Sequence, residues 1–146
     1  MKSLRTLIKK QIGNGGSKYW KYCGFSGYVD WCAMLVWWII QKDGTYKYMA
    51  QGKNPYYVPN VVKYAEKNDL IIPREKVEVG DLVVYDFNKN GVGDHIGFFW
   101  GDKPDDAFAA VEGNTGPNPG RVKKRTRYEA QVLCYIRLKK QKKKKA

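Results

Sequence analysis

The sequence contains little histidine, little cysteine and no long apolar segment. Its 146 residues include one histidine and three cysteines. The odd number and the spacing of Cys23, Cys32 and Cys134 argue against a disulfide framework and against the common zinc-ligand patterns. The longest apolar stretch, residues 31–40, is too short to span a bilayer, and the first residues lack an apolar run of signal-peptide length. We therefore expect reduced thiols, no transmembrane segment, and synthesis in the cytoplasm without a signal peptide.

Acidic residues are scarce relative to basic ones. The chain has 27 Lys and Arg against 14 Asp and Glu, which gives a formal net charge of +13. Six lysines in the run at 139–145 supply +6 of this charge and leave +7 for the rest. Such a balance predicts an anionic partner, and nucleic acid, anionic lipid and acidic cell-wall polymers all qualify. Charge by itself does not choose among them.

The length and composition predict one folded domain at residues 1–138 and a lysine-rich tail at 139–146. The hydrophobic fraction of 43% is ordinary for a globular protein. Helical patterns come first, at residues 1–12, between Asp30 near a cap and Gly44 past the end, and at about 60–67. An aromatic, glycine-broken loop is expected at 19–28.

Strand patterns follow in the second half of the chain. They occupy residues 81–87, 95–100, 109–114, 122–127 and 131–138. The Asn90-Gly91 dipeptide between the first two strands is a hairpin signal. Helices followed by strands predict an α+β fold, with N-terminal helices packed on a mostly antiparallel β-sheet.

Two residues together could supply nucleophilic catalysis. Cys32 lies in the first turn of the expected buried helix, where free backbone N–H groups and the helix dipole favour a thiolate. Position alone favours a buried structural cysteine over a catalytic one. His95 is the one histidine, so a Cys–His mechanism has a single candidate base. It opens a strand, and small Gly97 two residues on leaves room on the same face for a neighbouring helix end.

A third polar group usually holds the second nitrogen of such a histidine. Glu112 and Asn114 are the candidates, since side chains two residues apart on a strand share a face and could both approach His95. Glu112 is the first choice and Asn114 the second. The alternative is a solvated glutamate followed by an asparagine in a turn.

Four segments carry a resemblance to a known family. They are Trp-Cys-Ala-Met-Leu-Val-Trp-Trp at 31–38, Val-Gly-Asp-Leu-Val-Val-Tyr at 79–85, Asp-His-Ile-Gly at 94–97 and Glu-Gly-Asn-Thr at 112–115. In order and spacing they resemble the successive motifs of the CHAP domain (cysteine, histidine-dependent amidohydrolase/peptidase). The resemblance implies a papain-like fold related to the NlpC/P60 group and peptidoglycan as the substrate. It places the nucleophile on Cys32, the base on His95, and the third and fourth site residues on Glu112 and Asn114.

The function implied is hydrolysis of an amide or peptide bond of the bacterial cell wall by a phage-type endolysin. Which bond is cut, as an N-acetylmuramoyl-L-alanine amidase or as a peptidoglycan endopeptidase, stays open because specificity depends on loops such as 47–57. We expect a monomer that acts on the wall after release and contacts peptidoglycan and anionic wall polymers, with no specific nucleic acid. A tail-associated or effector hydrolase fits the sequence too.

A second class of function is a basic, non-catalytic module that uses its charge and aromatic residues on nucleic acid or an anionic wall polymer. Against it, the basic residues are spread along the chain and the aromatic ones cluster with apolar runs. Such a module would bind with a steep salt dependence and would be indifferent to thiol alkylation.

One loop has the spacing of oxygen ligands in a calcium site. Its members are Asp86, Asn88, Asn90 and Asp94, with Gly91 at the turning position. The bidentate glutamate of such loops is missing, so the loop is either a weak calcium site or a plain Asx-rich hairpin. The thiol mechanism requires no cofactor, and calcium is the one ion that the sequence suggests.

Overall fold

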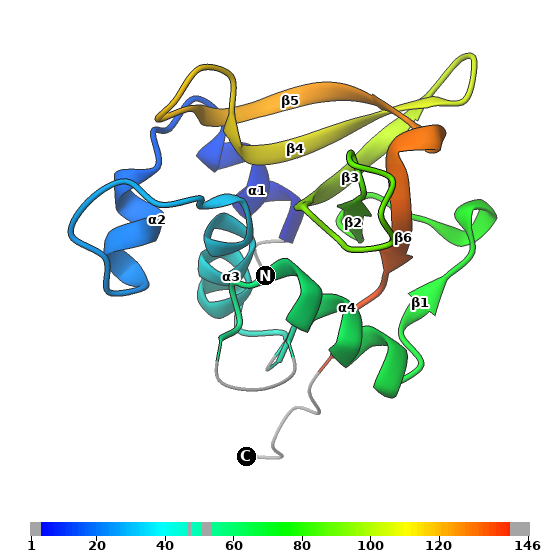
Figure 1. The fold of residues 1–146 in the computed structure, drawn as a ribbon, viewed down its shortest axis with the longest axis horizontal. Coiled ribbons are helices and arrows are strands. Elements are labelled where there is room, and N and C mark those ends of the chain that lie inside the picture. Colours follow the sequence, from blue (N-terminus) through cyan, green and yellow to red (C-terminus); the bar gives the residue numbers. More distant parts are fainter. Residues whose placement is uncertain (1–3, 47, 51–53, 141–146) are drawn as a thin grey trace.

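The computed structural model describes residues 4–46, 48–50 and 54–140. This part of the chain is a mixed α+β structure with four α-helices and a six-stranded sheet (Figure 1). The helices are α1 (Leu4–Gln11), α2 (Ser17–Tyr22), α3 (Cys32–Asp43) and α4 (Val58–Lys67). The strands are β1 (Ile71–Ile72), β2 (Leu82–Tyr85), β3 (His95–Lys103), β4 (Ala107–Thr115), β5 (Arg121–Tyr128) and β6 (Val132–Ile136). Helices followed by strands confirm the predicted α+β class.

The sheet has the strand order β1-β6-β2-β3-β4-β5, and its neighbouring strands are antiparallel. The helix α3 packs against β3 and β4, and α2 packs beside α3, as Figure 1 shows. The start of α3 therefore lies close to the middle of the sheet. None of the helices in the described ranges has the length and apolar character that crossing a membrane requires.

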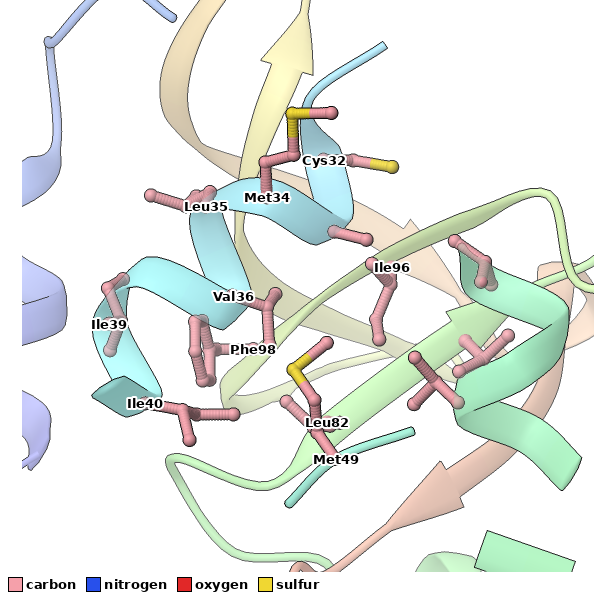
Figure 2. Packing of buried hydrophobic residues seen from close by; sticks show 14 of the residues in the cluster. Cys32, Met34, Leu35, Val36, Ile39, Ile40, Met49, Leu82, Ile96 and Phe98 are labelled. Carbon is pink, nitrogen blue, oxygen red and sulfur yellow. The ribbon is translucent and has the colours of Figure 1, made fainter. Parts of the chain in front are cut away.

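Side-chain alternation divides the buried residues between two apolar clusters, one on each face of the sheet. The larger cluster joins α3 to one face through residues such as Leu35, Ile39, Leu82, Ile96 and Phe98 (Figure 2). The smaller cluster lies on the opposite face and contains Val83, Tyr85, Phe99, Phe108, Ala110 and Tyr135. Since His95 pairs directly with Tyr85, it belongs to the face of the smaller, aromatic cluster.

The predicted buried helix is confirmed at both ends. Gly44 follows the last turn with φ of 73°, a left-handed conformation that glycine adopts without strain. Asp30 lies near the cap as predicted, directly before the N-cap residue Trp31, which makes no side-chain capping bond within the described residues. The Asp30 side chain lies within hydrogen-bonding distance of Tyr28 and Asn114.

Other local expectations need correction. The segment predicted as an aromatic loop begins with the short helix α2, because Tyr19 and Trp20 are buried by tertiary packing. The connection between β2 and β3 is the loop 86–94 rather than a tight Asn-Gly turn, and Lys89 and Gly91 carry its positive φ values. The part of the lysine-rich tail at 141–146, and residues 47 and 51–53 of the expected specificity loop, lie outside the described residues.

Candidate active site

The start of α3 is held in place by Trp31, the residue before Cys32. The indole is wedged between two backbones, since a Cβ at Gly16 would lie 2.3 Å from its ring and one at Gly113 would lie 2.6 Å from it. It also stacks on Tyr19 with ring centroids 5.5 Å apart. Its Nε1–H donates to the carbonyl of Pro119 at 2.8 Å. These contacts fix the position from which the Cys32 side chain projects.

Cys32 occupies the first turn of α3, as predicted. The first backbone bond of this helix runs from the Leu35 N–H to the Trp31 carbonyl at 3.0 Å, so the N–H groups before Leu35 have no intrahelical acceptor. Cys32 is 7% exposed and belongs to the larger apolar cluster, and in Figure 2 its sulfur points away from the other labelled residues. The first turn of a helix places this thiol beside free backbone N–H groups.

His95 is brought to this thiol from the first position of β3. Its ring lies within hydrogen-bonding and electrostatic reach of Cys32. On its other side, Nε2 donates to Oε1 of Glu112 at 3.0 Å. Glu112 uses Nε2, and Nδ1 is therefore the ring nitrogen left for the thiol. Tyr85 and Phe87 stack against the imidazole, with ring centroids 5.7 and 5.8 Å away.

The third member of the site is Glu112 on β4, which is fully buried. Its side chain lies over Gly97, where a Cβ would come within 2.5 Å of the Glu112 Cγ. The prediction that Gly97 leaves room for a helix end is therefore wrong, because the carboxylate side chain fills that space. The prediction that Glu112 approaches His95 is confirmed.

Sequence reasoning missed the fourth member, Arg127 on β5. Its Nε lies 3.1 and 3.0 Å from the two carboxylate oxygens of Glu112, and its Nη2 also contacts Oε1. The guanidinium packs over the rings of Tyr85 and Phe87, at 5.3 and 5.0 Å from their centroids. A buried carboxylate needs a cation beside it, and the alternating basic residues of β5 were the signal that could have supplied one.

These contacts set the protonation of the pair. Burial lowers the pKa of His95, but hydrogen bonds to Cys32 and Glu112, together with their negative charges, outweigh it and raise the pKa to about 9. Burial raises the pKa of Glu112, and the hydrogen bonds and charges of His95 and Arg127 reverse this and lower it to about 2. At neutral pH the imidazole is thus protonated between a carboxylate and the sulfur.

Asn114 does not share the face of Glu112, contrary to the predicted alternation. The β4–β5 pairing shifts register between Glu112 and Thr115, and Asn114 has φ of 55°. Such a bulge turns one side chain away from its expected side. The Asn114 Oδ1 lies 2.8 Å from the Tyr28 hydroxyl, and the amide donates to Asp30 at 3.3 Å. Tyr28 is in turn within electrostatic reach of Cys32, so Asn114 lies on the thiol side of the site.

In the loop with calcium-like spacing, the acidic side chains accept hydrogen bonds from the backbone of the loop itself. Asp86 accepts the N–H groups of Asn90 and Gly91 at 3.2 and 2.7 Å, and Asp94 accepts that of Asn88 at 3.2 Å. These are the bonds of an Asx-rich turn. Among the described residues, no three His, Cys, Asp or Glu side chains gather as a metal site. Calcium binding stays a prediction.

The other two cysteines have different surroundings. Cys23, Cys32 and Cys134 are all free thiols. Burial raises the pKa of Cys23 to about 11. Burial, with a contribution from the charge of Glu66, raises the pKa of Cys134 to about 12. Neither lies beside a histidine, and both fit the structural role that the sequence suggested for them.

The arrangement can perform acyl transfer: it combines a thiol, a protonated imidazole that can release a proton to a leaving group, a carboxylate that orients that imidazole, and free N–H groups at a helix start. Comparisons of the sequence with known proteins identify no relative of this chain. A scan against models of protein families finds no match for the chain, and a search of curated proteins finds none either.

Proposed function

We propose that this protein is a cysteine hydrolase that cuts an amide or peptide bond of bacterial peptidoglycan. The observation that carries the proposal is the line of contacts from Cys32 through His95 and Glu112 to Arg127. Each member is needed for the next: the arginine keeps the carboxylate charged, the carboxylate orients the imidazole, and the imidazole activates the thiol.

The first chemical step is attack of the Cys32 thiolate on the carbonyl carbon of the scissile bond. The carbonyl oxygen becomes an oxyanion, which the free N–H groups at the start of α3 would stabilise, at about 3 kcal/mol for a well-placed donor. Collapse of this intermediate breaks the C–N bond. The protonated His95 gives its proton to the departing amine, and a thioester remains on Cys32.

The second step is hydrolysis of the thioester. His95, now neutral, takes a proton from a water molecule, and the resulting hydroxide attacks the thioester carbonyl. The acid product leaves and the thiolate is restored, with the proton back on His95. Glu112 stays ionised throughout and holds the ring by Nε2, which is the role of the third member in such triads.

Peptidoglycan as the substrate is supported by the four linked motifs that resemble the CHAP domain. A helix-start thiol facing a histidine on an antiparallel strand also agrees with the papain-like fold that this resemblance implies. The surplus of basic residues suits a wall that carries anionic polymers. A phage-type endolysin is the form of hydrolase that we propose.

The test is a wall-clearing assay with the full chain and purified Gram-positive walls. The parent should reduce turbidity, and Cys32→Ala and His95→Ala should each lose at least about a hundred-fold of the rate, because a nucleophile and its base act together. Cys134→Ala, which removes a thiol outside the site, is the matched control and should keep the parent rate. Mass spectrometry of the released fragments then identifies the bond that is cut.

Two results would contradict the proposal. One is a Cys32→Ala variant that clears walls as fast as the parent. The other is a parent that binds walls with steep salt dependence, cuts nothing, and is unaffected by alkylation of Cys32. The second result would favour the basic, non-catalytic module.

A further inference from the structure

A cavity lies beside the turn that joins β4 to β5, away from the thiol itself. Its volume is about 320 Å³. Gly15, in the link between α1 and α2, forms an isolated bridge with Arg121, so this link closes one side of the cavity (Figure 1). The lining consists of Gly15, Gly120, Thr115, Pro117, Pro119, Arg121 and Lys123. The two cations are the only charged members of this described lining.

Lys123 and Arg121 both have N–H groups that are not used in hydrogen bonds among the described residues. The ammonium of Lys123 forms no hydrogen bond or ion pair within the described part of the chain. It lies under the turn, since a Cβ at Gly116 would be 3.1 Å from its Nζ. Arg121 donates Nη1–H to the carbonyl of Gly13 at 3.0 Å, and its other N–H groups remain for a ligand. Two cations without a carboxylate between them suit an oxyanion.

The walls of this cavity are connected to the thiol. Thr115 directly follows Asn114, and the Tyr28 hydroxyl lies within 2.8 Å of Asn114 and 3.0 Å of Asn118. The same turn accepts the indole N–H of Trp31 at the carbonyl of Pro119. A substrate that reaches the turn is thereby placed relative to the residue that positions Cys32.

We propose that this cavity is a subsite that binds an oxyanion group of the wall substrate through Lys123 and Arg121. The inference rests on the proposed hydrolysis of peptidoglycan and names the chemistry that the enzyme would recognise beside the scissile bond. A wall offers this chemistry as the carboxylates of stem peptides and as the phosphates of attached polymers. The experiment separates these two sources.

The first arm measures hydrolysis by Lys123→Gln and by a matched control, Lys124→Gln. Lys124 is the next residue on β5, is exposed, and points to the opposite face of the strand. On untreated walls we expect Lys123→Gln to be roughly ten-fold slower than the parent, the effect of one lost charge-assisted hydrogen bond, and Lys124→Gln to stay within about two-fold.

The same arm compares walls stripped of phosphate polymers with walls whose carboxylates have been converted to amides. The treatment that slows the parent but leaves Lys123→Gln unchanged identifies the source of the oxyanion. If Lys123→Gln cuts untreated walls at the parent rate, the subsite does not exist.

The second arm does not depend on activity. Succinate and inorganic phosphate are titrated separately into the full chain, and the backbone amide signals of Gly116 and Gly120 are followed by NMR. At least one anion should shift them saturably in the parent and in Lys124→Gln, and the shift should be lost in Lys123→Gln. Absence of any shift, or equal shifts in all three proteins, would overturn the subsite. If the parent cuts no wall but the shifts behave as expected, the proposed hydrolysis fails while the oxyanion site stands.

Discussion

Two arginine–carboxylate pairs cross neighbouring strands in this protein, and in both the arginine contacts the two carboxylate oxygens. Arg127 grips both oxygens of Glu112 near the thiol. Arg137, just after β6, grips both oxygens of Asp81 just before β2, at 3.1 and 2.8 Å. Each pair thus joins two strands by a two-pronged contact.

The pairs differ in their third partner and in their exposure. Asp81 also accepts the backbone N–H of Glu78 at 2.8 Å, and the Arg137 side chain is 41% exposed. Glu112 is fully buried and binds the imidazole of His95, while the Arg127 side chain is 13% exposed. The pair of Arg137 and Asp81 therefore joins two neighbouring segments of the chain. The pair of Arg127 and Glu112, in contrast, supports a titratable group, the imidazole of His95. Under the proposed function, this difference predicts that catalysis depends on Glu112 and that Asp81 serves stability.

The largest expected effect is on activity when the two carboxylates are made neutral. Glu112→Gln should reduce wall clearing by about a hundred-fold or more, because His95 loses the group that orients and charges it. Asp81→Asn should keep the rate of its folded fraction within about two-fold. Turbidity assays on both variants, with circular dichroism to measure the folded fraction, check this. Equal activity loss in the two variants would abolish the distinction between the pairs.

A steric change should displace the Glu112 carboxylate without removing any residue of the site. An alanine at Gly97 would place its Cβ 2.5 Å from the Glu112 Cγ and 2.9 Å from the Val111 carbonyl, so the carboxylate must move. We expect Gly97→Ala to lose at least about ten-fold in kcat, since small displacements of catalytic groups are costly. Gly27→Ala, where nothing lies within 4 Å, is the control and should leave kcat unchanged. A normal kcat in Gly97→Ala would mean that Glu112 is not needed where it lies.

Substitution of Arg127 should lower the free energy of unfolding more than substitution of Arg137 does. Arg127→Met leaves Glu112 buried with one charged partner fewer, which costs about 3 kcal/mol or more of the free energy of unfolding. Arg137→Met removes an arginine whose side chain is 41% exposed, so water can reach the carboxylate in its place, and the change should cost only about 1 kcal/mol. Urea denaturation of both variants measures the difference. If Arg137→Met is the less stable protein, burial does not rank these pairs as we argue.

The smallest expected effect is a pH dependence of the free energy of unfolding, which His95 and Glu112 should confer and the pair of Arg137 and Asp81 should not. The pKa of His95 is raised from 6.5 to about 9, so its contribution to stability is complete below pH 6.5 and is lost as the pH rises through about 9. The pKa of Glu112 is lowered from 4.5 to about 2, so its contribution is present above pH 4.5 and is lost as the pH falls through about 2.

Denaturation of the parent and His95→Gln at several pH values measures this contribution. The difference between the two proteins should be largest near pH 6 and shrink as the pH rises from 6.5 to about 9. Asp81→Asn, whose pair contains no histidine, should differ from the parent by a constant amount between pH 6.5 and pH 9. A constant difference for His95→Gln over this range would mean that the imidazole is not held in its charged form.

The sequence was sufficient to predict the parts of the site that depend on local patterns. Cys32 at a helix start and His95 at the start of a strand follow from hydrophobic periodicity and turn residues. Glu112 was the first of two candidates for the partner of His95, and strand alternation did not decide between it and Asn114. The settings of Cys32 and His95 needed only the positions of elements along the chain.

The parts that depend on register were not predictable in this way. Arg127 reaches Glu112 because β5 pairs with β4, and one sequence does not give that register. Asn114 left its expected face because a bulge interrupts this same pairing. The helix α2 was missed because its six residues are too few for a periodic signal, and it is stabilised by burial of Tyr19 and Trp20. Tertiary contacts decided each of these features.

The central claim is that His95, held by Glu112 and Arg127, activates Cys32. The pH dependence of thiol alkylation tests this claim most directly. Iodoacetamide is applied to the folded protein between pH 5 and 10, and modification of each cysteine is followed by peptide mass spectrometry. We predict that Cys32, beside His95, is modified at a lower pH than Cys23 and Cys134, whose pKa values burial raises to about 11 and 12. In His95→Ala this early reaction should slow at least ten-fold. A Cys32 that reacts no earlier than the other two cysteines, or that reacts as fast without His95, would contradict the account.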